Sequence, residues 1–321
     1  MSSRASAAEL KNTLALVTGG GRGIGRAIAV ALARAGADVA LFGRTPEPLQ
    51  QTAAEIRAQG RRSWHAVTDV GWPEQVSGAV AGLLEEWGRL DVLVNNAGVQ
   101  GPIGPLQETD PAAWWQAVQT NLFGCYLCTR AVLPGMLAQE HGRIINLSGG
   151  GAVSPRPRYS AYSASKAAVV RMTETLAAEL EGTGVTVNAI APGAVNTRML
   201  DETLAAGASA GDQALAEARQ QVRDGGVDPE IPARLAVFLA SRRAEALTGR
   251  LLSAVWDPWE DLDIGAVMAG EDYTVRRLKP ADRAGAAERE GRADREGRAE
   301  RPARADRPAP ADRQTPAPGG G

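Results

Sequence analysis

Short apolar runs alternate along the chain with longer segments of helical periodicity. Leu14–Val17 and Asp38–Phe42 are the first two apolar runs, and the Ala-, Ile- and Leu-rich segment Arg26–Ala35 lies between them. Leu14–Val17 is predicted to be a buried parallel strand, Asp38–Phe42 to be a second strand and the longer segment to be a helix. Five more strands are predicted on the same grounds, at Ser63–Val67, Asp91–Val94, Arg143–Leu147, Val185–Ile190 and Gly249–Val255.

Strands that alternate with helices are typical of a doubly wound, Rossmann-type parallel sheet with helices on both faces. The sequence therefore predicts an α/β fold whose ligands bind at the carboxyl ends of the strands. Further helices are predicted at Pro46–Gln59, Trp72–Trp87, Pro111–Gln139, Tyr159–Glu181 and Pro232–Ala240.

The end of the chain differs in composition from the part before it. Residues 280–321 are rich in Arg, Ala, Pro and Asp and contain no Ile, Leu, Val, Met, Phe, Tyr or Trp. Such a segment cannot bury enough apolar surface to offset the entropy lost on ordering. We expect a flexible N-terminus at 1–9, a single dinucleotide-binding domain at 10–279 and a disordered tail at 280–321.

Composition and charge exclude several classes of function. The 321 residues are 44% hydrophobic with a formal net charge of −2, so neither nucleic-acid binding nor a basic membrane patch is expected. No apolar run approaches the length of a membrane span, and the first dozen residues lack the apolar stretch of a signal peptide. The two histidines, His65 and His141, belong to no ligand cluster, so no metal site is expected. These features favour a soluble cytoplasmic protein.

A glycine-rich turn follows the first predicted strand. Thr18–Gly25 reads T-G-G-G-R-G-I-G, with Gly19, Gly23 and Gly25 in the spacing G-x3-G-x-G. A strand, a glycine turn and a helix in this order form a phosphate site, because N–H groups at the helix start face the anion. The turn therefore predicts that the chain binds a dinucleotide.

The end of the second predicted strand favours NADP over NAD. Dinucleotide folds that use NAD often place an acid there, which binds the ribose 2′-hydroxyl. Here the residues are Phe42-Gly43-Arg44-Thr45, and Arg22 lies within the glycine turn. Two guanidinium groups and no carboxylate suit a 2′-phosphate, so NADP (NADPH) is the expected cofactor. One alternative is that the cofactor is NAD. Another is that Arg22 and Arg44 are solvated arginines at the surface.

Tyr162 and Lys166 are four residues apart, so they share one face of a helix. A phenol has an ordinary pKa of about 10, and an ammonium one turn away favours the phenolate. The pair suits proton transfer to or from an alcohol or ketone oxygen. This spacing is common on helix surfaces, so the pair gains weight only from the other motifs.

Six motifs together resemble the short-chain dehydrogenase/reductase family, over roughly residues 10–260. The resemblance implies a nicotinamide cofactor and hydride transfer between an alcohol and a carbonyl. It also implies a homodimer or homotetramer that pairs the helices at 111–139 and 159–181. The motifs are Thr18–Gly25, Asp69-Val70, N-N-A-G at 95–98, Asn121, Y-S-A-S-K at 162–166 and Ala191-Pro192-Gly193.

The resemblance implies roles for single residues. Tyr162 would be the proton donor or acceptor, Lys166 would bind the nicotinamide ribose and lower the tyrosine pKa, and Asn121 would hold a relay water. Asp69 would contact the adenine and Asn95 the adenosine ribose region. The implied cofactor contacts are Gly19, Arg22, Gly23, Ile24, Gly25, Arg44, Asp69, Val70, Asn95, Ala97, Gly98, Tyr162, Lys166, Pro192, Gly193, Val195 and Thr197.

One position departs from the family pattern. The family serine that hydrogen-bonds the substrate oxygen stands 13 residues before the tyrosine, and Gly149 occupies that position here, after Ser148. Neighbours on a regular strand point to opposite faces, so Ser148 would face away from Tyr162. A bulge in the glycine run 149–151 would turn Ser148 toward the site as a catalytic donor. The rival donors are a water, a backbone N–H of the run or another serine.

Three further segments carry weaker signals. Ser154–Arg158 is basic and stiffened by proline, and we expect it to be exposed rather than to contact an acidic substrate. Arg198–Val227 takes the place of the family's mobile substrate lid. Cys125 and Cys128 form C-x-x-C on an apolar helix, where buried inert thiols are expected rather than a redox pair.

The leading hypothesis is an NADP-dependent oxidoreductase that acts on a small carbonyl or alcohol compound, with reduction of a ketone as the main direction. One alternative is an NAD-dependent dehydrogenase of a sugar-like or polyol alcohol. Another is a cofactor-binding regulator with little turnover. Gly149, which replaces the family serine, is the feature that leaves this alternative open. Turnover with a panel of ketones would separate these classes.

Overall fold

The computed structural model describes residues 9–277. Residues 9–275 belong to one compact unit. The predicted flexible N-terminus, apart from Glu9, and the predicted tail lie outside the described residues. None of the helices within 9–277 is long and apolar enough to cross a lipid bilayer.

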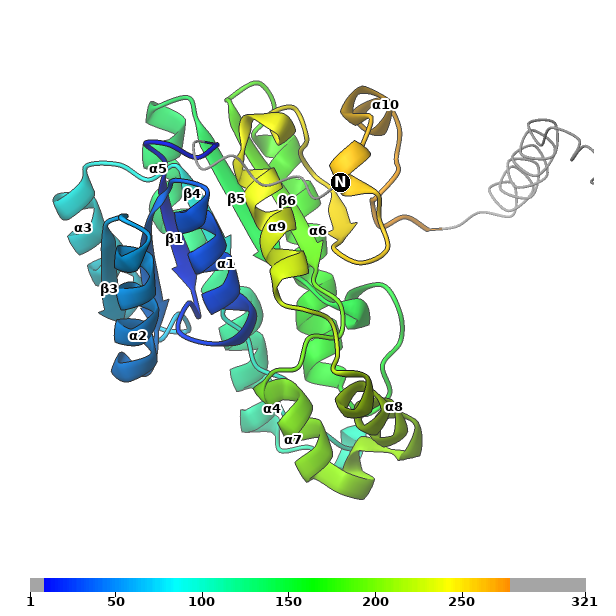
Figure 1. Cartoon of the computed structure of the whole chain (residues 1–321). Helices are drawn as coiled ribbons and strands as arrows, with labels where there is room; N and C mark the ends of the chain where they lie inside the picture. Colours follow the sequence, from blue (N-terminus) through cyan, green and yellow to red (C-terminus); the bar gives the residue numbers. More distant parts are fainter. Residues whose placement is uncertain (1–8, 278–321) are drawn as a thin grey trace, which may run out of the picture. The chain divides into compact units, whose positions relative to one another are not determined.

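Seven strands form one parallel sheet in the order β3-β2-β1-β4-β5-β6-β7 (Figure 1). Leu16 of β1 lies opposite Ala40 of β2 on one side and Leu93 of β4 on the other. The strand order reverses at β1, as in a doubly wound fold, and the predicted fold class is confirmed. The strands are β1 (Leu14–Thr18), β2 (Asp38–Gly43), β3 (Ser63–Val67), β4 (Val92–Asn95), β5 (Gly142–Leu147), β6 (Val185–Ala191) and β7 (Leu251–Ser253).

Helices cover both faces of this sheet. The apolar sides of α1, α2 and α9 pack on one face, and those of α3, α5 and α6 pack on the other. Figure 1 shows α1, α2 and α9 in front of the strands. The helices are α1 (Gly23–Arg34), α2 (Pro46–Ala58), α3 (Pro73–Trp87), α4 (Pro111–Val118), α5 (Gly124–Ala138), α6 (Ser160–Glu179), α7 (Arg198–Ala206), α8 (Asp212–Asp224), α9 (Glu230–Ala240) and α10 (Ile264–Ala269).

Alternate strand residues fill the two layers. Val39 and Leu41 of β2 pack in the layer with α1 and α9, whereas Ala40 and Phe42 pack in the layer with α3 and α5. Neighbouring strand residues point to opposite faces, so a strand covered on both faces is a continuous apolar run. This is why the apolar runs in the sequence predicted the strands closely.

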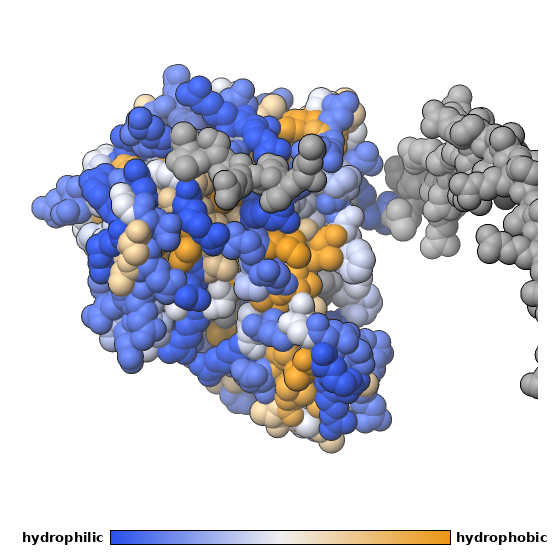
Figure 2. Space-filling model, viewed as in Figure 1, coloured by the Kyte–Doolittle hydropathy of each residue, from blue (hydrophilic) through white to orange (hydrophobic). Residues whose placement is uncertain are grey.

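The structure differs from the predicted elements in several places, including a last strand shortened to Leu251–Ser253 and an unpredicted α10. The first helix begins at Gly23, three residues before the predicted Arg26. The helix predicted over 111–139 contains a π-helical segment, Gln119–Phe123, between α4 and α5. The lid region folds into α7, a 3-10 turn at Gly207–Ala210 and α8. Figure 2 shows a mostly hydrophilic face, with a hydrophobic area over α7 and α8.

Candidate active site

The turns after β1, β4, β5 and β6 lie at one edge of the sheet, because these strands are neighbours and parallel. They carry the glycine-rich turn, the N-N-A-G segment, the glycine run 149–151 and the Ala191–Gly193 segment. The fold therefore gathers four motifs that are far apart in the sequence.

The glycine-rich turn relies on conformations and close contacts that exclude side chains. Gly19 and Gly23 have φ of +64° and +51°, in the left-handed region that favours glycine. A Cβ at Gly25 would lie 2.3 Å from the Gly19 carbonyl oxygen. Arg22 precedes α1 without a side-chain capping hydrogen bond. The first N–H groups of α1 are thus left for an anion, which fits the pyrophosphate of a dinucleotide.

A second helix start lies beside this turn. A Cβ at Gly23 would lie 3.3 Å from Cγ2 of Thr197, the residue that precedes α7. Thr197, like Arg22, makes no side-chain capping hydrogen bond. Ile24 packs against the apolar layer beneath α1 and anchors the turn. Two helix N-termini without side-chain caps therefore lie side by side, which favours a bound anion.

Close packing fixes the segment that leads into α7. Gly193 has φ of +83°, and a Cβ there would lie 2.6 Å from Val255 Cγ2. Pro192 is buried, and Val195 forms an isolated parallel bridge with Val227. This bridge joins the two ends of the lid region 198–227, so the lid starts and finishes beside the predicted nicotinamide contacts.

The arginine after β2 faces the aspartate after β3. Arg44 is exposed, and its Nη1 lies 4.0 Å from Asp69 Oδ2. Asp69 Oδ1 accepts from the Gly71 N–H at 3.0 Å. Val70 is buried against the helix, where a Cβ at Gly124 would lie 2.6 Å from Val70 Cγ2. Asp69 and Val70 thus shape the loop, while the Arg44 guanidinium stays accessible to a ligand.

The two asparagines of the N-N-A-G motif have different partners. Asn95 is buried, and its Nδ2 donates to Asn146 Oδ1 at 2.9 Å, so its contact with the cofactor stays a prediction. Asn96 Nδ2 donates to the Thr18 carbonyl oxygen at 2.9 Å, and the Ala97 N–H donates to Thr18 Oγ1 at 3.0 Å. Asn96 ties the motif to the glycine-rich turn. Sequence analysis missed this role, although the motif itself contains Asn96.

Gly98 connects this motif to the helix of the tyrosine and lysine. A Cβ at Gly98 would lie 3.2 Å from Asn121 Oδ1 and 3.4 Å from Lys166 Nζ. Asn121 lies in the π-helical segment, a feature common at functional sites. Its side chain accepts from the Val99 N–H at 2.8 Å and donates to Ser165 Oγ at 2.9 Å. The Asn121 side chain thus joins the loop after β4 to α6, and its water-holding role stays a prediction.

Tyr162 and Lys166 are buried on α6, with exposed fractions of 8% and 4%. Lys166 Nζ lies 5.9 Å from the Tyr162 ring centroid and donates to the Leu147 carbonyl oxygen at 2.6 Å. Burial lowers the pKa of Lys166 to about 8. Among residues 9–277 this ammonium forms no ion pair with a carboxylate. A buried cation kept without a counter-ion is a mark of a functional site.

Burial raises the pKa of Tyr162, and the positive charge of Arg156 acts in the opposite direction. The Arg156 guanidinium carbon lies 5.8 Å from the Tyr162 ring centroid. The lowering of the tyrosine pKa by Lys166 therefore stays a prediction. A protonated phenol is the form that can donate to a carbonyl oxygen.

The predicted bulge after β5 is absent, and Ser148 forms no hydrogen bond with Tyr162 in the described part of the chain. The β5–β6 register is unbroken up to Leu147 opposite Ile190, and the Ser148 N–H donates to the Ile190 carbonyl oxygen at 2.8 Å. The Ser148 hydroxyl is buried and donates to the Lys166 carbonyl oxygen at 3.5 Å. The ladder to β6 holds the backbone straight through Ser148 and places its hydroxyl against α6, so its role as the catalytic donor stays a prediction.

Gly149 faces the tyrosine hydroxyl instead. A Cβ at Gly149 would lie 2.4 Å from Tyr162 Oη, too close for any side chain without movement of the ring. The Gly149 φ of 176° is extended backbone, so the chain continues straight past the end of β5. Gly149, which stands 13 residues before Tyr162, is therefore the residue that lies at the site, and it has no hydroxyl group.

The lid packs on two tyrosines of the site. Tyr159 and Tyr162 form an apolar cluster with Ala210, and Tyr159 Oη donates to Thr203 Oγ1 of α7 at 3.3 Å. Apolar lid residues therefore pack beside the Tyr162 ring. Partly buried residues around this cluster are Ile103, Met199, Ala206 and Ala214.

The C-x-x-C thiols are not part of this site chemistry. Cys125 and Cys128 are both free and buried. Burial raises the pKa of Cys125 to about 12 and also raises that of Cys128. The predicted burial of both thiols is confirmed, and because the thiolate is the reactive form, their inertness stays a prediction that the raised pKa values support.

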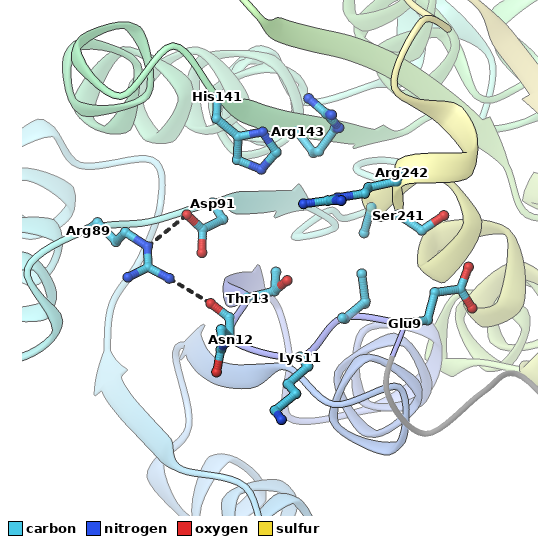
Figure 3. A pocket seen from close by; sticks show the side chains of 12 residues that line it. Glu9, Lys11, Asn12, Thr13, Arg89, Asp91, His141, Arg143, Ser241 and Arg242 are labelled. Carbon is cyan, nitrogen blue, oxygen red and sulfur yellow. Dashed lines mark hydrogen bonds and ion pairs between the residues drawn. The ribbon is translucent and has the colours of Figure 1, made fainter.

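A pocket of about 300 Å³ lies at the opposite edge of the sheet (Figure 3). Its lining includes Thr13, Asp91 and Arg143, which lie at the amino ends of β1, β4 and β5. Asp91 accepts from Arg89 Nε at 3.1 Å and from the Leu14 N–H at 2.8 Å. Open α/β sheets bind ligands at the carboxyl ends of their strands, so the other edge is the candidate active site.

Comparisons with known proteins agree with this geometry. The short chain dehydrogenase family profile matches residues 13–207. The chain is 37% identical over 248 residues to (2S)-[(R)-hydroxy(phenyl)methyl]succinyl-CoA dehydrogenase subunit BbsD of Thauera aromatica, which covers 76% of this chain and 95% of that protein.

Two solved structures are also similar to the chain. NAD+-bound xylitol dehydrogenase matches with a TM-score of 0.71 at 28% identity, over 76% of this chain and 98% of that one. A variant of actinorhodin polyketide ketoreductase with NADPH matches with a TM-score of 0.70 at 36% identity, over 75% and 95%.

Proposed function

Because the chain belongs to the short-chain dehydrogenase/reductase family and is an oxidoreductase of that family, we propose that it reduces a ketone with NADPH. The observation that carries this proposal is the buried Tyr162–Lys166 pair at the carboxyl edge of the sheet. The pair supplies a proton donor and a fixed cation, and the uncapped helix starts beside it suit a dinucleotide.

The proposed chemistry divides the work between the protein and its cofactor. The reduced nicotinamide, when bound, supplies the hydride. Tyr162 donates a proton to the ketone oxygen, in an environment where burial keeps the phenol protonated before the reaction. Lys166, held by the Leu147 carbonyl oxygen, keeps a positive charge beside the tyrosine and the ribose. The packed lid excludes water from the reacting atoms.

The proposal of NADPH over NADH rests on the residues after β2. Arg44 is accessible there, and its guanidinium lies 4.0 Å from Asp69 on the neighbouring loop. Arg22 is exposed at the start of α1. A 2′-phosphate would accept charge-assisted hydrogen bonds from these arginines, worth about 1.5–3 kcal/mol each.

The backbone of the glycine run replaces the missing serine hydroxyl in this proposal. The N–H groups of Gly149, Gly150 and Gly151 donate to no acceptor within residues 9–277. Gly150 borders open space, since a Cβ there would contact nothing within 4 Å. Backbone N–H groups directed at a developing oxyanion stabilise the transition state. Ser148, bonded to the Lys166 carbonyl oxygen, is not the donor in this proposal.

The test is steady-state turnover of a ketone panel, followed by the absorbance of NADPH or NADH. We expect turnover of at least one ketone and a preference for NADPH of at least tenfold in kcat/KM. Tyr162→Phe, which keeps the ring, is the matched control and should abolish the signal. Absence of ketone turnover, together with turnover of an alcohol and NAD+, would contradict the proposal.

A second candidate is oxidation of a polyol with NAD. The similarity to NAD+-bound xylitol dehydrogenase is the observation that favours it. The apolar lid residues packed beside Tyr162 oppose it, because a polyol needs several hydrogen-bonding partners. Initial rates with xylitol and NAD+ decide between the two candidates.

We propose that the chain forms a homodimer or homotetramer through the helices at 111–138 and 160–179. Large apolar side chains are exposed along the first of these, including Trp115 at 62% and Tyr126 at 44%. Phe123 stacks on Tyr126 with ring centroids 5.8 Å apart, which extends this apolar surface. Sedimentation of wild type and Tyr126→Glu measures the prediction, and a monomeric wild type would contradict it.

A further inference from the structure

Arg156 lies against the rings of the candidate active site. Its guanidinium carbon is 3.9 Å from the Tyr159 ring centroid and 5.8 Å from that of Tyr162. The side chain is half-buried, whereas Arg158 two residues later is exposed. The expectation that the whole Ser154–Arg158 segment is exposed is therefore wrong for Arg156, because the Tyr159 ring face attracts its cation.

The Arg156 guanidinium has no acceptor for its N–H groups in the part of the chain that the structure describes. Its recorded contacts there are those with the two tyrosine rings and the charge effect on Tyr162. Stacking uses the flat face of a guanidinium and leaves the five N–H donors at its edge free. The unused donors are therefore available to water or to an acceptor on a ligand.

The surroundings of Arg156 favour an anionic partner. The rings of Tyr159 and Tyr162 and the lid residue Ala210 make the neighbouring wall apolar. Attraction between opposite charges is stronger beside such a wall than in open water. Pro155 and Pro157 restrict the backbone on both sides of Arg156, so its position is set before a ligand binds.

We propose that the substrate is an anionic ketone, a short keto carboxylate whose acid group pairs with Arg156 while Tyr162 protonates its ketone oxygen. The inference rests on the proposed ketone reduction and adds the substrate class. The carbonyl carbon gains the hydride, the carbonyl oxygen gains the Tyr162 proton, and NADPH becomes NADP+. The carboxylate takes no part in this step and leaves unchanged in the hydroxy acid.

The experiment compares keto acids with their methyl esters, from pyruvate through acetoacetate to levulinate, in wild type and in Arg156→Gln. We expect wild type to prefer the best acid over its ester at least tenfold in kcat/KM. Arg156→Gln should raise KM for that acid about tenfold to a hundredfold, because a charge-assisted hydrogen bond to the carboxylate is lost. The value of kcat should stay within threefold of wild type. The ester should change less than threefold.

Two variants separate recognition of the acid from a general charge effect. Arg158→Gln removes the same charge from the same segment but from an exposed side chain, so it should leave both substrates within twofold of wild type. Arg156→Lys keeps the charge without the planar fork and should recover part of the acid preference. An equal loss for acid and ester in Arg156→Gln, or a wild type that prefers the ester, overturns the inference while ketone reduction stands.

A binding measurement keeps the inference testable if no ketone is reduced. Calorimetric titration of levulinate into wild type with saturating NADP+ should show binding that Arg156→Gln loses and Arg158→Gln retains. That result without turnover would support anion recognition and contradict the proposed reduction. Binding that does not depend on Arg156, or no binding of any acid, overturns the inference whatever the turnover.

Discussion

Two aspartates at the amino edge of the sheet and two cations near Tyr162 at the carboxyl edge differ in their partners. At the amino edge, buried Asp38 accepts from Arg62 Nε at 2.8 Å and lies 2.7 Å from Arg61 Nη2. Asp91 is likewise bonded to Arg89 and to a backbone N–H. Around Tyr162 at the carboxyl edge, Lys166 and Arg156 have no carboxylate partner among residues 9–277.

This difference separates charges that hold the fold from charges that wait for a ligand. Burial alone would raise the pKa of Asp38, but hydrogen bonds from Arg62 and the charge of Arg61 lower it overall, so this carboxylate stabilises the folded state. Burial lowers the pKa of Lys166 to about 8, so this ammonium destabilises the folded state without ligand. Variants of Asp38 should therefore change the free energy of unfolding and leave turnover unchanged. Variants near Tyr162 should change turnover or ligand binding, and Lys166 variants should change stability as well.

The largest effect should come from Tyr162→Phe at the carboxyl edge. Loss of the phenol placed beside Lys166 should reduce kcat about 10²- to 10⁴-fold or more, the usual contribution of a general acid. NADPH affinity, measured by fluorescence titration, should stay within threefold because the ring and the lysine remain. Wild-type turnover in this variant would remove Tyr162 from the mechanism.

Lys166→Met should lower turnover about 10²-fold. It should also raise the stability of the ligand-free protein by a few kcal/mol, because it removes an uncompensated buried cation. The folded pKa is about 8 and the ordinary value is 10.5, so the unfolded chain holds more protons between these values. Wild-type stability therefore rises relative to Lys166→Met as pH increases from about 8 to 10.5. Urea unfolding at several pH values measures this, and a gap independent of pH would contradict it.

Arg44→Ala should raise the NADPH dissociation constant about tenfold or more and leave that of NADH within twofold, because only NADPH carries the 2′-phosphate. Arg26→Ala is the matched control, since that exposed arginine of α1 pairs with Glu55. Equal weakening of both cofactors would mean that Arg44 acts on the loop through Asp69 rather than on the phosphate.

Asp38→Asn at the amino edge should lower the free energy of unfolding by about 1–3 kcal/mol, as Arg61 and Arg62 lose their charged partner. The values of kcat and KM should stay within twofold. The folded pKa is below the ordinary value of 3.8, so wild type loses its advantage as pH falls through that region and keeps it above. Paired urea titrations at neutral and acid pH provide the measurement.

Ser148→Ala should have the smallest effect, with kcat/KM within threefold of wild type, because its hydroxyl meets the Lys166 carbonyl oxygen. Gly149→Ser is the informative companion. It should reduce activity rather than improve it, since its Cβ would lie 2.4 Å from Tyr162 Oη and displace the ring. A hundredfold loss in Ser148→Ala would restore that serine as the donor of the missing hydrogen bond.

Local patterns in the sequence predicted much of this molecule. The apolar runs located the strands because a strand covered on both faces is apolar throughout. The i to i+4 spacing placed Tyr162 and Lys166 on one helix face, as α6 confirms. Glycines such as Gly19 and Gly23 indicated a turn between the first strand and the first helix, and the structure has a turn there. Each of these properties depends on residues a few positions apart.

The tertiary structure alone decided where the site's polar groups point. The ladder to Ile190 keeps Ser148 against α6 below the tyrosine, while Gly149 reaches the Tyr162 hydroxyl past the end of β5. Arg156 was expected at the surface, and only the packing of the chain before α6 showed its stacking on Tyr159. Beyond the end of a strand, side-chain direction depends on contacts with residues distant in the chain, and no local period encodes those contacts.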